Sequence, residues 1–196
     1  MSSHQIFKVG LKDLHPIDAA VHYNAYRLLP MFKKLNYTPN DLTTESIICG
    51  LFSVCFLYRG NAYLAVLASF MSYFFDVADG LYARRYNMVT KFGDYYDHVS
   101  DIIQYILYVG ILIYKYNLLD HKLIIRVLLP IQLIGLSLYL GCVEKIYTKE
   151  SSPTLSIFRR MCIINPKNNV PLLKFFSPMN NLIILYLITI LLVGYY

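Results

Sequence analysis

Long apolar runs, separated by short polar segments, make up most of the chain. The runs lie at about residues 42–58, 62–86, 93–116, 122–147 and 179–196. Each is long enough to cross a bilayer once as a helix. The pattern predicts an all-α fold, a polytopic transmembrane helix bundle with five to six membrane helices. Residues 151–178 have a mixed pattern and leave the sixth membrane helix open.

The N-terminal part of the chain has an amphipathic pattern instead. Apolar residues recur at helical spacing over residues 17–29, and Pro30 interrupts the pattern. Such a segment is typical of a helix lying on the membrane surface, and equally of an ordinary surface helix. Tyr37 to Asp41 then predicts a turn before the first membrane helix. We therefore divide the chain into an N-terminal arm with an interfacial helix, residues 1–36, and a membrane domain, residues 37–196.

Composition and charge support an integral, multi-pass membrane protein. Hydrophobic residues make up 57% of the chain and the mean hydropathy is +0.45, against about 45–50% apolar in soluble domains. The net charge of +6 is better explained by topology and by attraction to anionic lipid than by nucleic acid, and we expect no nucleic-acid partner. With the N-terminus inside, fourteen basic residues fall on inside segments and four outside, namely Arg59, Lys115, Lys122 and Arg126.

The cysteine pattern argues against a metal or disulfide framework. Cys49, Cys55, Cys142 and Cys162 form no CxxC pair, and three of them lie inside apolar runs. We predict that they act as small hydrophobic residues rather than as disulfides or zinc ligands. Residues 1–15 contain no apolar run, so no cleavable signal peptide is expected there.

One polar stretch, Phe75 to Asp101, interrupts the apolar pattern. Asp76 and Asp79 are three residues apart, and Asp97 and Asp101 are four apart, so each pair shares one face of a helix. An uncompensated aspartate near the bilayer centre costs roughly 2.5–3.5 kcal/mol, so four would cost on the order of 10. Two divalent cations would balance the four charges. Carboxylates without histidine or cysteine ligands favour Mg²⁺ or Mn²⁺, and the charge bias places this site at the cytoplasmic face.

The stretch also resembles the signature of the CDP-alcohol phosphatidyltransferase family, D-x2-D-G-x2-A-R-x8-G-x3-D-x3-D. The positions that match without an insertion are Asp76, Asp79, Gly80, Ala83, Arg84, Gly93, Asp97 and Asp101. The segment Thr38 to Thr43 is similar to the family's "PN" segment before its first membrane helix. The signature at 76–101 is highly specific, and the resemblance covers about residues 17–116, beyond which only the alternation of membrane helices matches.

The resemblance implies a phospholipid-synthesising phosphotransferase that depends on Mg²⁺ or Mn²⁺. A hydroxyl of the acceptor attacks the β-phosphorus of a CDP-linked lipid or alcohol, forming a phosphodiester and releasing CMP. It implies that Asp76, Asp79, Asp97 and Asp101 hold two ions, with Asp101 or His98 as the base. It further implies that Asn40, Gly80, Ala83, Arg84 and Gly93 bind the CDP group. Members of the family typically have six membrane helices and form homodimers.

The donor and the acceptor stay open at this point. His98 in YDHVSD resembles the "FDH-x-x-D" of choline- and ethanolaminephosphotransferases, whereas the chain length is closer to enzymes that use CDP-diacylglycerol. His98 is either a proton acceptor or a residue that only hydrogen-bonds a carboxylate. Arg159 and Arg160 either bind a phosphorylated acceptor or carry positive-inside charge.

Two other classes compete with this interpretation. Intramembrane prenyltransferases bind metal diphosphate through paired aspartate motifs, but they usually place these motifs far apart on a longer chain. A cation transporter would more often set its carboxylates at the bilayer midplane, whereas these lie near helix ends beside Arg84 and Lys91. Binding of CDP-alcohols separates the first interpretation from both alternatives.

Overall fold

The computed structural model of the chain describes residues 6–11, 14–118, 123–147, 159–160, 162 and 174–195. These residues form α-helices and one short 3-10 helix, and they contain no strand, so the all-α prediction is confirmed. The elements are α1 (Pro16–Lys34), α2 (Pro39–Tyr58), α3 (Ala62–Arg85), α4 (Lys91–Tyr116), α5 (Leu123–Tyr147), η2 (Lys174–Phe176) and α8 (Pro178–Tyr195).

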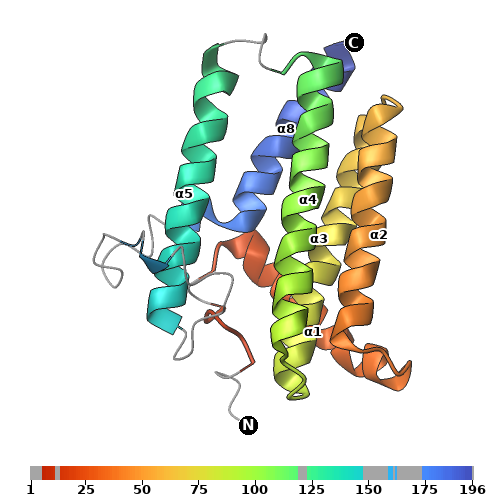
Figure 1. Cartoon of the computed structure of the whole chain (residues 1–196), viewed down its shortest axis with the longest axis vertical. Coiled ribbons are helices and arrows are strands. Elements are labelled where there is room, and N and C mark those ends of the chain that lie inside the picture. Colours follow the sequence, from red (N-terminus) through yellow and green to blue (C-terminus); the bar gives the residue numbers. More distant parts are fainter. Residues whose placement is uncertain are drawn as a thin grey trace.

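The long helices lie side by side and α1 lies obliquely near one end of them (Figure 1). Helix α3 is central, because it packs against α1, α2 and α8, while α2 also packs against α4. Helix α5 stands at the edge of the bundle and contacts η2 and α8. The loop between α3 and α4 therefore lies at the same end as α1, and the loop between α2 and α3 lies at the opposite end.

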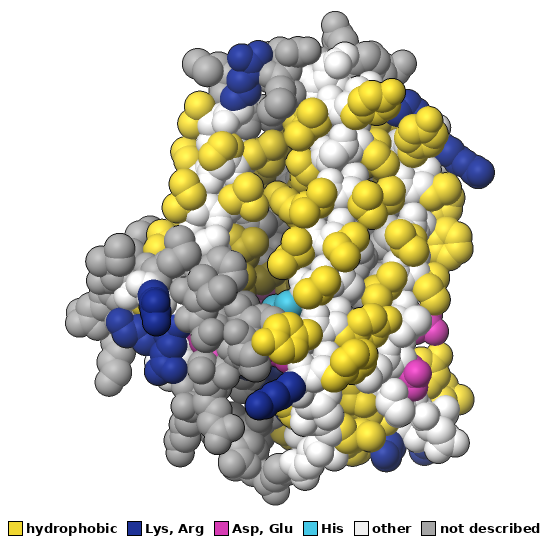
Figure 2. Space-filling view, in the orientation of Figure 1, with side chains coloured by type: hydrophobic (Ala, Val, Ile, Leu, Met, Phe, Trp, Pro, Cys, Tyr) yellow, Lys and Arg dark blue, Asp and Glu magenta, His cyan; other side chains and the backbone are white. Residues whose placement is uncertain are grey.

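Within the described residues, three helical segments are long and apolar enough to cross a membrane: Pro39–Tyr58, Ala62–Arg85 and Arg126–Ile146. Pro178–Gly194 is a shorter apolar helix. Helix α4 is not among them, and its first half carries Lys91, Asp94, Asp97 and Asp101. Figure 2 shows hydrophobic side chains over much of the face formed by α2, α4 and α5. Several apolar helices are thus present, and the number of five to six membrane helices stays a prediction.

Helix α1 continues through Pro30, where the sequence pattern predicted an interruption. Proline has no N–H, so the carbonyl of Tyr26, four residues earlier, loses its helical partner. The Arg85 guanidinium replaces it, because its Nη1 donates to the Tyr26 oxygen at 3.3 Å and its Cζ lies 4.5 Å from the centre of the Tyr26 ring. The arginine of α3 thus allows the helix to extend to Lys34. Buried Val21, Ala25, Leu29 and Phe32 form the side that packs on α3.

Helix α2 begins at Pro39, inside the segment predicted as a turn. Thr38 is the N-cap, and its backbone N–H donates to Asp41 Oδ2 at 2.7 Å while Asp41 N–H donates to Thr38 Oγ1 at 3.3 Å. This reciprocal pair is a capping box, and proline at the first helical position needs no N–H acceptor. The helix therefore starts three residues earlier than the apolar pattern suggested.

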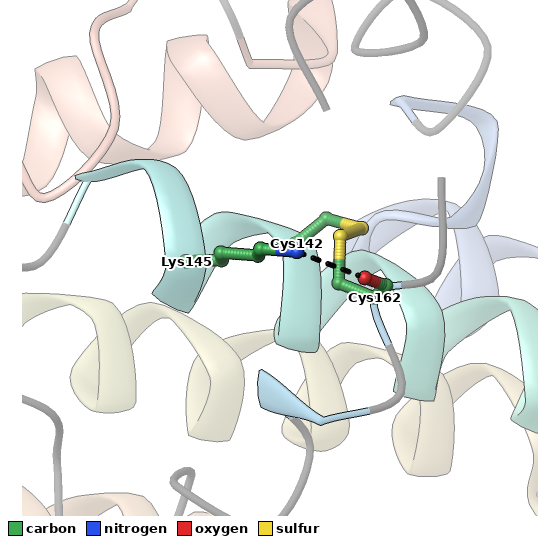
Figure 3. Close-up of a disulfide and its surroundings, with 3 residues drawn as sticks. All are labelled: Cys142, Lys145 and Cys162. Carbon is green, nitrogen blue, oxygen red and sulfur yellow. Dashed lines mark hydrogen bonds between the residues drawn. A yellow bond between two sulfur atoms is a disulfide. The ribbon is translucent and has the colours of Figure 1, made fainter. Parts of the chain in front are cut away.

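Cys142 of α5 forms a disulfide with Cys162, so the prediction for these two cysteines was wrong. Their Cα atoms are 5.0 Å apart, and Lys145 Nζ donates to the carbonyl oxygen of Cys162 at 3.2 Å (Figure 3). The pairing depends on where the chain returns after α5, which the spacing of cysteines along the sequence does not encode. Cys49 and Cys55 are free thiols, as predicted. Whether residues 151–178 contain a sixth membrane helix is a question that lies largely outside the described residues.

Candidate metal centre

Three aspartate side chains from α3 and α4 converge. One carboxylate oxygen each from Asp76, Asp97 and Asp101 lies within 4.8 Å of the other two. Asp76 comes from the second half of α3, and the other two come from successive turns of α4. The spacing of Asp97 and Asp101 puts both on one side of α4, as predicted.

A tight connection between α3 and α4 makes this convergence possible. Tyr86 ends α3, Asn87 takes a left-handed backbone conformation with φ of 56°, and Thr90 is the N-cap of α4. Thr90 Oγ1 accepts from Gly93 N–H at 3.0 Å. Asparagine is among the few residues that adopt this conformation at low cost. The chain therefore reverses within five residues, and the polar end of α3 faces the polar start of α4.

Asp79, the fourth predicted ligand, is not part of this group of three. Its side chain is buried, and its Oδ2 accepts a short hydrogen bond from Thr43 Oγ1 of α2. It still interacts electrostatically with Asp97 and Asp101. The structure therefore brings together three of the four aspartates and holds the last one against α2, at the edge of the group.

The charge of this group fits a divalent cation. At 4.8 Å two unit charges repel by about 3.5 kcal/mol at an effective dielectric constant of about 20. Asp76 interacts with Asp101, Asp97 and Asp79, in decreasing order of strength. Arg84 interacts favourably with the same region and offsets one negative charge. Oxygen donors alone suit Mg²⁺ or Mn²⁺ rather than zinc.

Arg84 is anchored from the N-terminal arm. Its Nε donates to the carbonyl oxygen of Ile6 at 2.8 Å, and its guanidinium lies over Gly80, where a Cβ would come within 3.2 Å of Nη1. Gly80 thus gives the guanidinium room along its own helix. Burial lowers the pKa of His22 on α1 below its ordinary value, so this neighbour of Arg84 adds no positive charge at neutral pH.

The other side of the group is formed by the start of α2. Asn40 lies next to Gly93, because a Cβ on Gly93 would come within 3.4 Å of Asn40 Oδ1. Thr44 Oγ1 donates to Asn40 O at 2.8 Å and lies 3.2 Å from the Tyr96 hydroxyl. Two residues that the sequence resemblance assigned to the CDP group are thus neighbours. Ala83 lies on α3 and is partly buried.

His98 lies between Asp94 and Asp97. Its Nδ1 is 2.8 Å from the carbonyl oxygen of Asp94 and 3.6 Å from Asp97 Oδ2. A carbonyl oxygen only accepts, so Nδ1 carries a proton in this contact, and in the neutral ring the lone pair is then on Nε2. Both earlier interpretations of His98, a proton acceptor and a carboxylate partner, are compatible with this geometry.

Sequence reasoning missed the hydroxyl and amide groups that surround the aspartates. Thr43 was noted only as the end of a motif. Ser72 Oγ lies 3.1 Å from Ser46 Oγ and 3.0 Å from Gln104 Oε1, which joins α2, α3 and α4 one turn away from Asp76 and Asp101. The sequence does contain a signal for these groups, because Ser72 and Gln104 are polar residues within apolar runs. Ser72 lies four residues before Asp76, and Gln104 lies three residues after Asp101.

Comparisons with known proteins agree with the motif. The model of the family described as CDP-alcohol phosphatidyltransferase matches residues 36–194. A CDP-diacylglycerol–serine O-phosphatidyltransferase from Bacillus subtilis is 35% identical over 71 residues, which cover 36% of this chain and 40% of that protein. An uncharacterized protein from Aquifex aeolicus is 38% identical over 74 residues, which cover 38% of each chain.

The aligned segment spans about two fifths of the length of these curated relatives. No solved structure matches the chain. The family model, however, covers more than half of the sequence and includes the whole aspartate motif, both halves of which the fold brings together. The chain therefore belongs to the CDP-alcohol phosphatidyltransferase family.

Proposed function

We propose that the protein catalyses metal-dependent transfer of a phosphatidyl group from CDP-diacylglycerol to a hydroxyl acceptor. The acceptor oxygen forms a bond to the β-phosphorus, the bond from that phosphorus to the bridging oxygen breaks, and CMP leaves. The convergence of Asp76, Asp97 and Asp101 at the end of α3 and the start of α4 carries this proposal. CDP-diacylglycerol is chosen over CDP-choline because the named activity of the Bacillus subtilis relative uses it.

The proposed roles of the side chains follow from their positions. Asp76, Asp97 and Asp101 would hold divalent ions, and Asp79 would complete the set from its buried place beside Thr43. Two such ions, when bound, neutralise a diphosphate and stabilise its attacking and leaving oxygens. Asn40, Gly80, Ala83, Arg84 and Gly93 would surround the CDP group.

The acceptor hydroxyl must lose its proton as it attacks. Asp101 belongs to the carboxylate group itself, and His98 has a free Nε2 lone pair one turn away on the same helix. We propose one of these two as the proton acceptor. The substitutions His98→Gln and Asp101→Asn separate them, because the base should be needed for turnover while the other residue should affect mainly metal affinity or its pH dependence.

Release of CMP is the direct test of the proposal. Purified protein in lipid nanodiscs, with CDP-diacylglycerol and Mg²⁺ or Mn²⁺, is given serine, glycerol phosphate or inositol in turn, and a parallel set uses CDP-choline with diacylglycerol. We expect CMP with CDP-diacylglycerol and one of the acceptors. Asp97→Asn should abolish it, whereas Glu45→Gln, which removes a carboxylate of α2 outside the group, should not. If no CDP-linked donor yields CMP with any acceptor, the proposed function is wrong.

Three further expectations belong to the same proposal. Residues 37–196 would form the catalytic membrane domain behind the arm and interfacial helix of residues 1–36. The site would face the cytoplasm, and the protein would act as a homodimer in the membrane. The positive-inside distribution supports the second of these, and the typical state of the family supports the third.

A further inference from the structure

We propose that Thr43 is a positioning residue that fixes the Asp79 carboxylate for the second cation. The inference rests on the proposed function only in requiring that divalent cations bind the aspartate group. It assigns a role to α2, which contributes no carboxylate to that group, and it explains why Asp79 lies apart from Asp76, Asp97 and Asp101.

The Thr43 hydroxyl has a defined position between two acceptors. It lies 3.3 Å from the carbonyl oxygen of Pro39 in its own helix and makes a short hydrogen bond to Asp79 Oδ2. Both side chains are buried, with Thr43 3% and Asp79 5% exposed. A hydroxyl has one hydrogen, and a carboxylate is the stronger acceptor of the two, so this hydrogen points to Asp79.

This bond restrains the direction of the carboxylate. Oδ2 is held toward α2, and Asp79 Oδ1 has no hydrogen-bond partner among the residues that the structure describes. The strongest electrostatic neighbours of Asp79 among the carboxylates are Asp97 and then Asp101. The second oxygen thus carries no hydrogen bond that would compete with an ion, while the bond from Thr43 restrains rotation of the carboxylate.

Outer groups that orient a ligand typically change metal affinity by about 10- to 100-fold when they are removed. We therefore expect Thr43→Val, which has nearly the same shape but no hydroxyl, to weaken one Mn²⁺ site by about this factor and to leave the other unchanged. Thr43→Ser keeps a hydroxyl and should bind Mn²⁺ within a few-fold of the unsubstituted protein. If Thr43 only filled space, Thr43→Val would keep its Mn²⁺ affinity and the smaller Thr43→Ser would lose more.

The experiment is a titration of the full chain in nanodiscs with Mn²⁺ alone, followed by electron paramagnetic resonance of the free ion. Thr44→Val is the matched control, because its hydroxyl contacts Asn40 O and Tyr96 rather than an aspartate. It should bind Mn²⁺ like the unsubstituted protein. The inference is overturned if Thr43→Val binds Mn²⁺ normally, or if Thr43→Ser is as weak as Thr43→Val.

Asp79→Asn and the double substitution with Thr43→Val test whether Thr43 acts through Asp79. Asp79→Asn should lose the same Mn²⁺ affinity, and adding Thr43→Val should cost nothing more. This comparison also covers the case in which Thr43→Val alone fails to fold, since the double variant has no carboxylate at position 79 that could be left without its hydrogen-bond donor. Normal Mn²⁺ binding by Asp79→Asn, or a further loss in the double variant, contradicts the inference.

The titration contains no CDP-linked donor, so the two proposals fail separately. A protein that binds Mn²⁺ in a Thr43-dependent way but never releases CMP would refute the proposed function and leave the role of Thr43 standing. CMP release together with Mn²⁺ binding that is independent of Thr43 would support the proposed function and refute the role of Thr43. Absence of any Mn²⁺ binding at millimolar concentration refutes the positioning role.

Discussion

At the scale of single residues, the aspartate group is costly to the folded protein and useful only with its ligand. Three carboxylates lie within 4.8 Å of one another, with a fourth at the edge, and Arg84 interacts favourably with several of them. Like charges at this distance destabilise the fold. The same repulsion is relieved when a divalent cation binds, so function and stability are opposed at this site.

This opposition predicts a reversal on substitution. Without divalent cations, Asp97→Asn should raise stability by about 1–2 kcal/mol, since one charge of the group is removed. With Mn²⁺ at about 100 times its dissociation constant, the unsubstituted protein should gain about 2.7 kcal/mol, and Asp97→Asn should gain much less. Thermal unfolding followed by circular dichroism measures both, as the chain has no tryptophan. Glu45→Gln should have the stability of the unsubstituted protein without cations and should gain as much from Mn²⁺. Equal Mn²⁺ shifts in all three proteins would contradict the prediction.

At the scale of helices, two close contacts decide how the elements near the site pack. The first joins α2 to α4 at Gly50, where a Cβ would overlap the Gln104 side chain. Gln104 in turn accepts from Ser72 Oγ of α3 at 3.0 Å. Gly50 thus lets three helices meet one turn from the carboxylates.

Gly50→Ala should therefore destabilise the protein by about 0.5–1.5 kcal/mol, because the Gln104 side chain must turn away and lose its hydrogen bond with Ser72 Oγ. Gly110→Ala is the matched control, because it lies on α4 with nothing within 4 Å of its Cβ position. It should stabilise the helix by about 0.5–1 kcal/mol, the usual gain of alanine over glycine. Thermal unfolding of the two variants and the unsubstituted protein, all in one detergent, measures both changes in stability. A stabilising Gly50→Ala would contradict this prediction.

The second contact is the arginine that replaces a missing helical bond. Arg85→Gln should weaken the docking of α1 because the Tyr26 carbonyl freed by Pro30 loses its donor. In a Pro30→Ala background an amide N–H returns to that carbonyl, so the loss on Arg85→Gln should shrink by about 0.5–1.5 kcal/mol. A double-mutant cycle on thermal stability measures this coupling. Additive effects would mean that Arg85 acts only through its contacts with aromatic rings.

Sequence reasoning predicted the helices and the spacing of the aspartates, because both follow from local periodicity. It could not predict the features that depend on contacts between distant segments. The pattern predicted a helix break at Pro30, because the arginine that replaces the missing hydrogen bond, Arg85, lies on another helix. The pairing of Cys142 with Cys162 likewise depends on two segments that are distant in the sequence. The hydrogen bond from Thr43 to Asp79 likewise forms only because α2 packs on α3. Local patterns therefore located the candidate site but not its supports.

At the scale of the whole molecule, the N-terminal arm joins the two parts of the bundle that flank the site. Ile6 accepts from Arg84 of α3, and Lys8 Nζ lies 2.7 Å from Glu144 Oε2 of α5, whose side chain is fully buried. Helix α5 has few other contacts with the centre of the bundle. Figure 2 shows a hollow between α4 and α5 in which histidine and acidic side chains are visible. The arm thus links α5 to α3 through these two contacts.

The two ends of the bundle also differ in charge, which predicts the orientation in the membrane. Lys33, Lys34, Arg84, Arg85 and Lys91 lie at the end that contains the turn between α3 and α4. At the opposite end Lys115 donates to the Tyr58 carbonyl oxygen, beside Arg59. The positive-inside rule places the first end in the cytoplasm. Helix α1 and the C-terminal end of α8 lie at opposite ends of the bundle (Figure 1), as an odd number of crossings requires.

Labelling with a membrane-impermeant thiol reagent tests this orientation. Cys49 and Cys55 are replaced by alanine, and a single cysteine is placed at exposed Val89 in the turn between α3 and α4 or at exposed Tyr63 near the start of α3. We expect Tyr63→Cys to react in intact cells and Val89→Cys to react only after permeabilisation, because 24 residues of α3 separate the two ends. A reporter after Tyr196 should behave like Tyr63→Cys. The reverse pattern would put the aspartates outside, and a C-terminal reporter that behaves like Val89→Cys would require an even number of crossings.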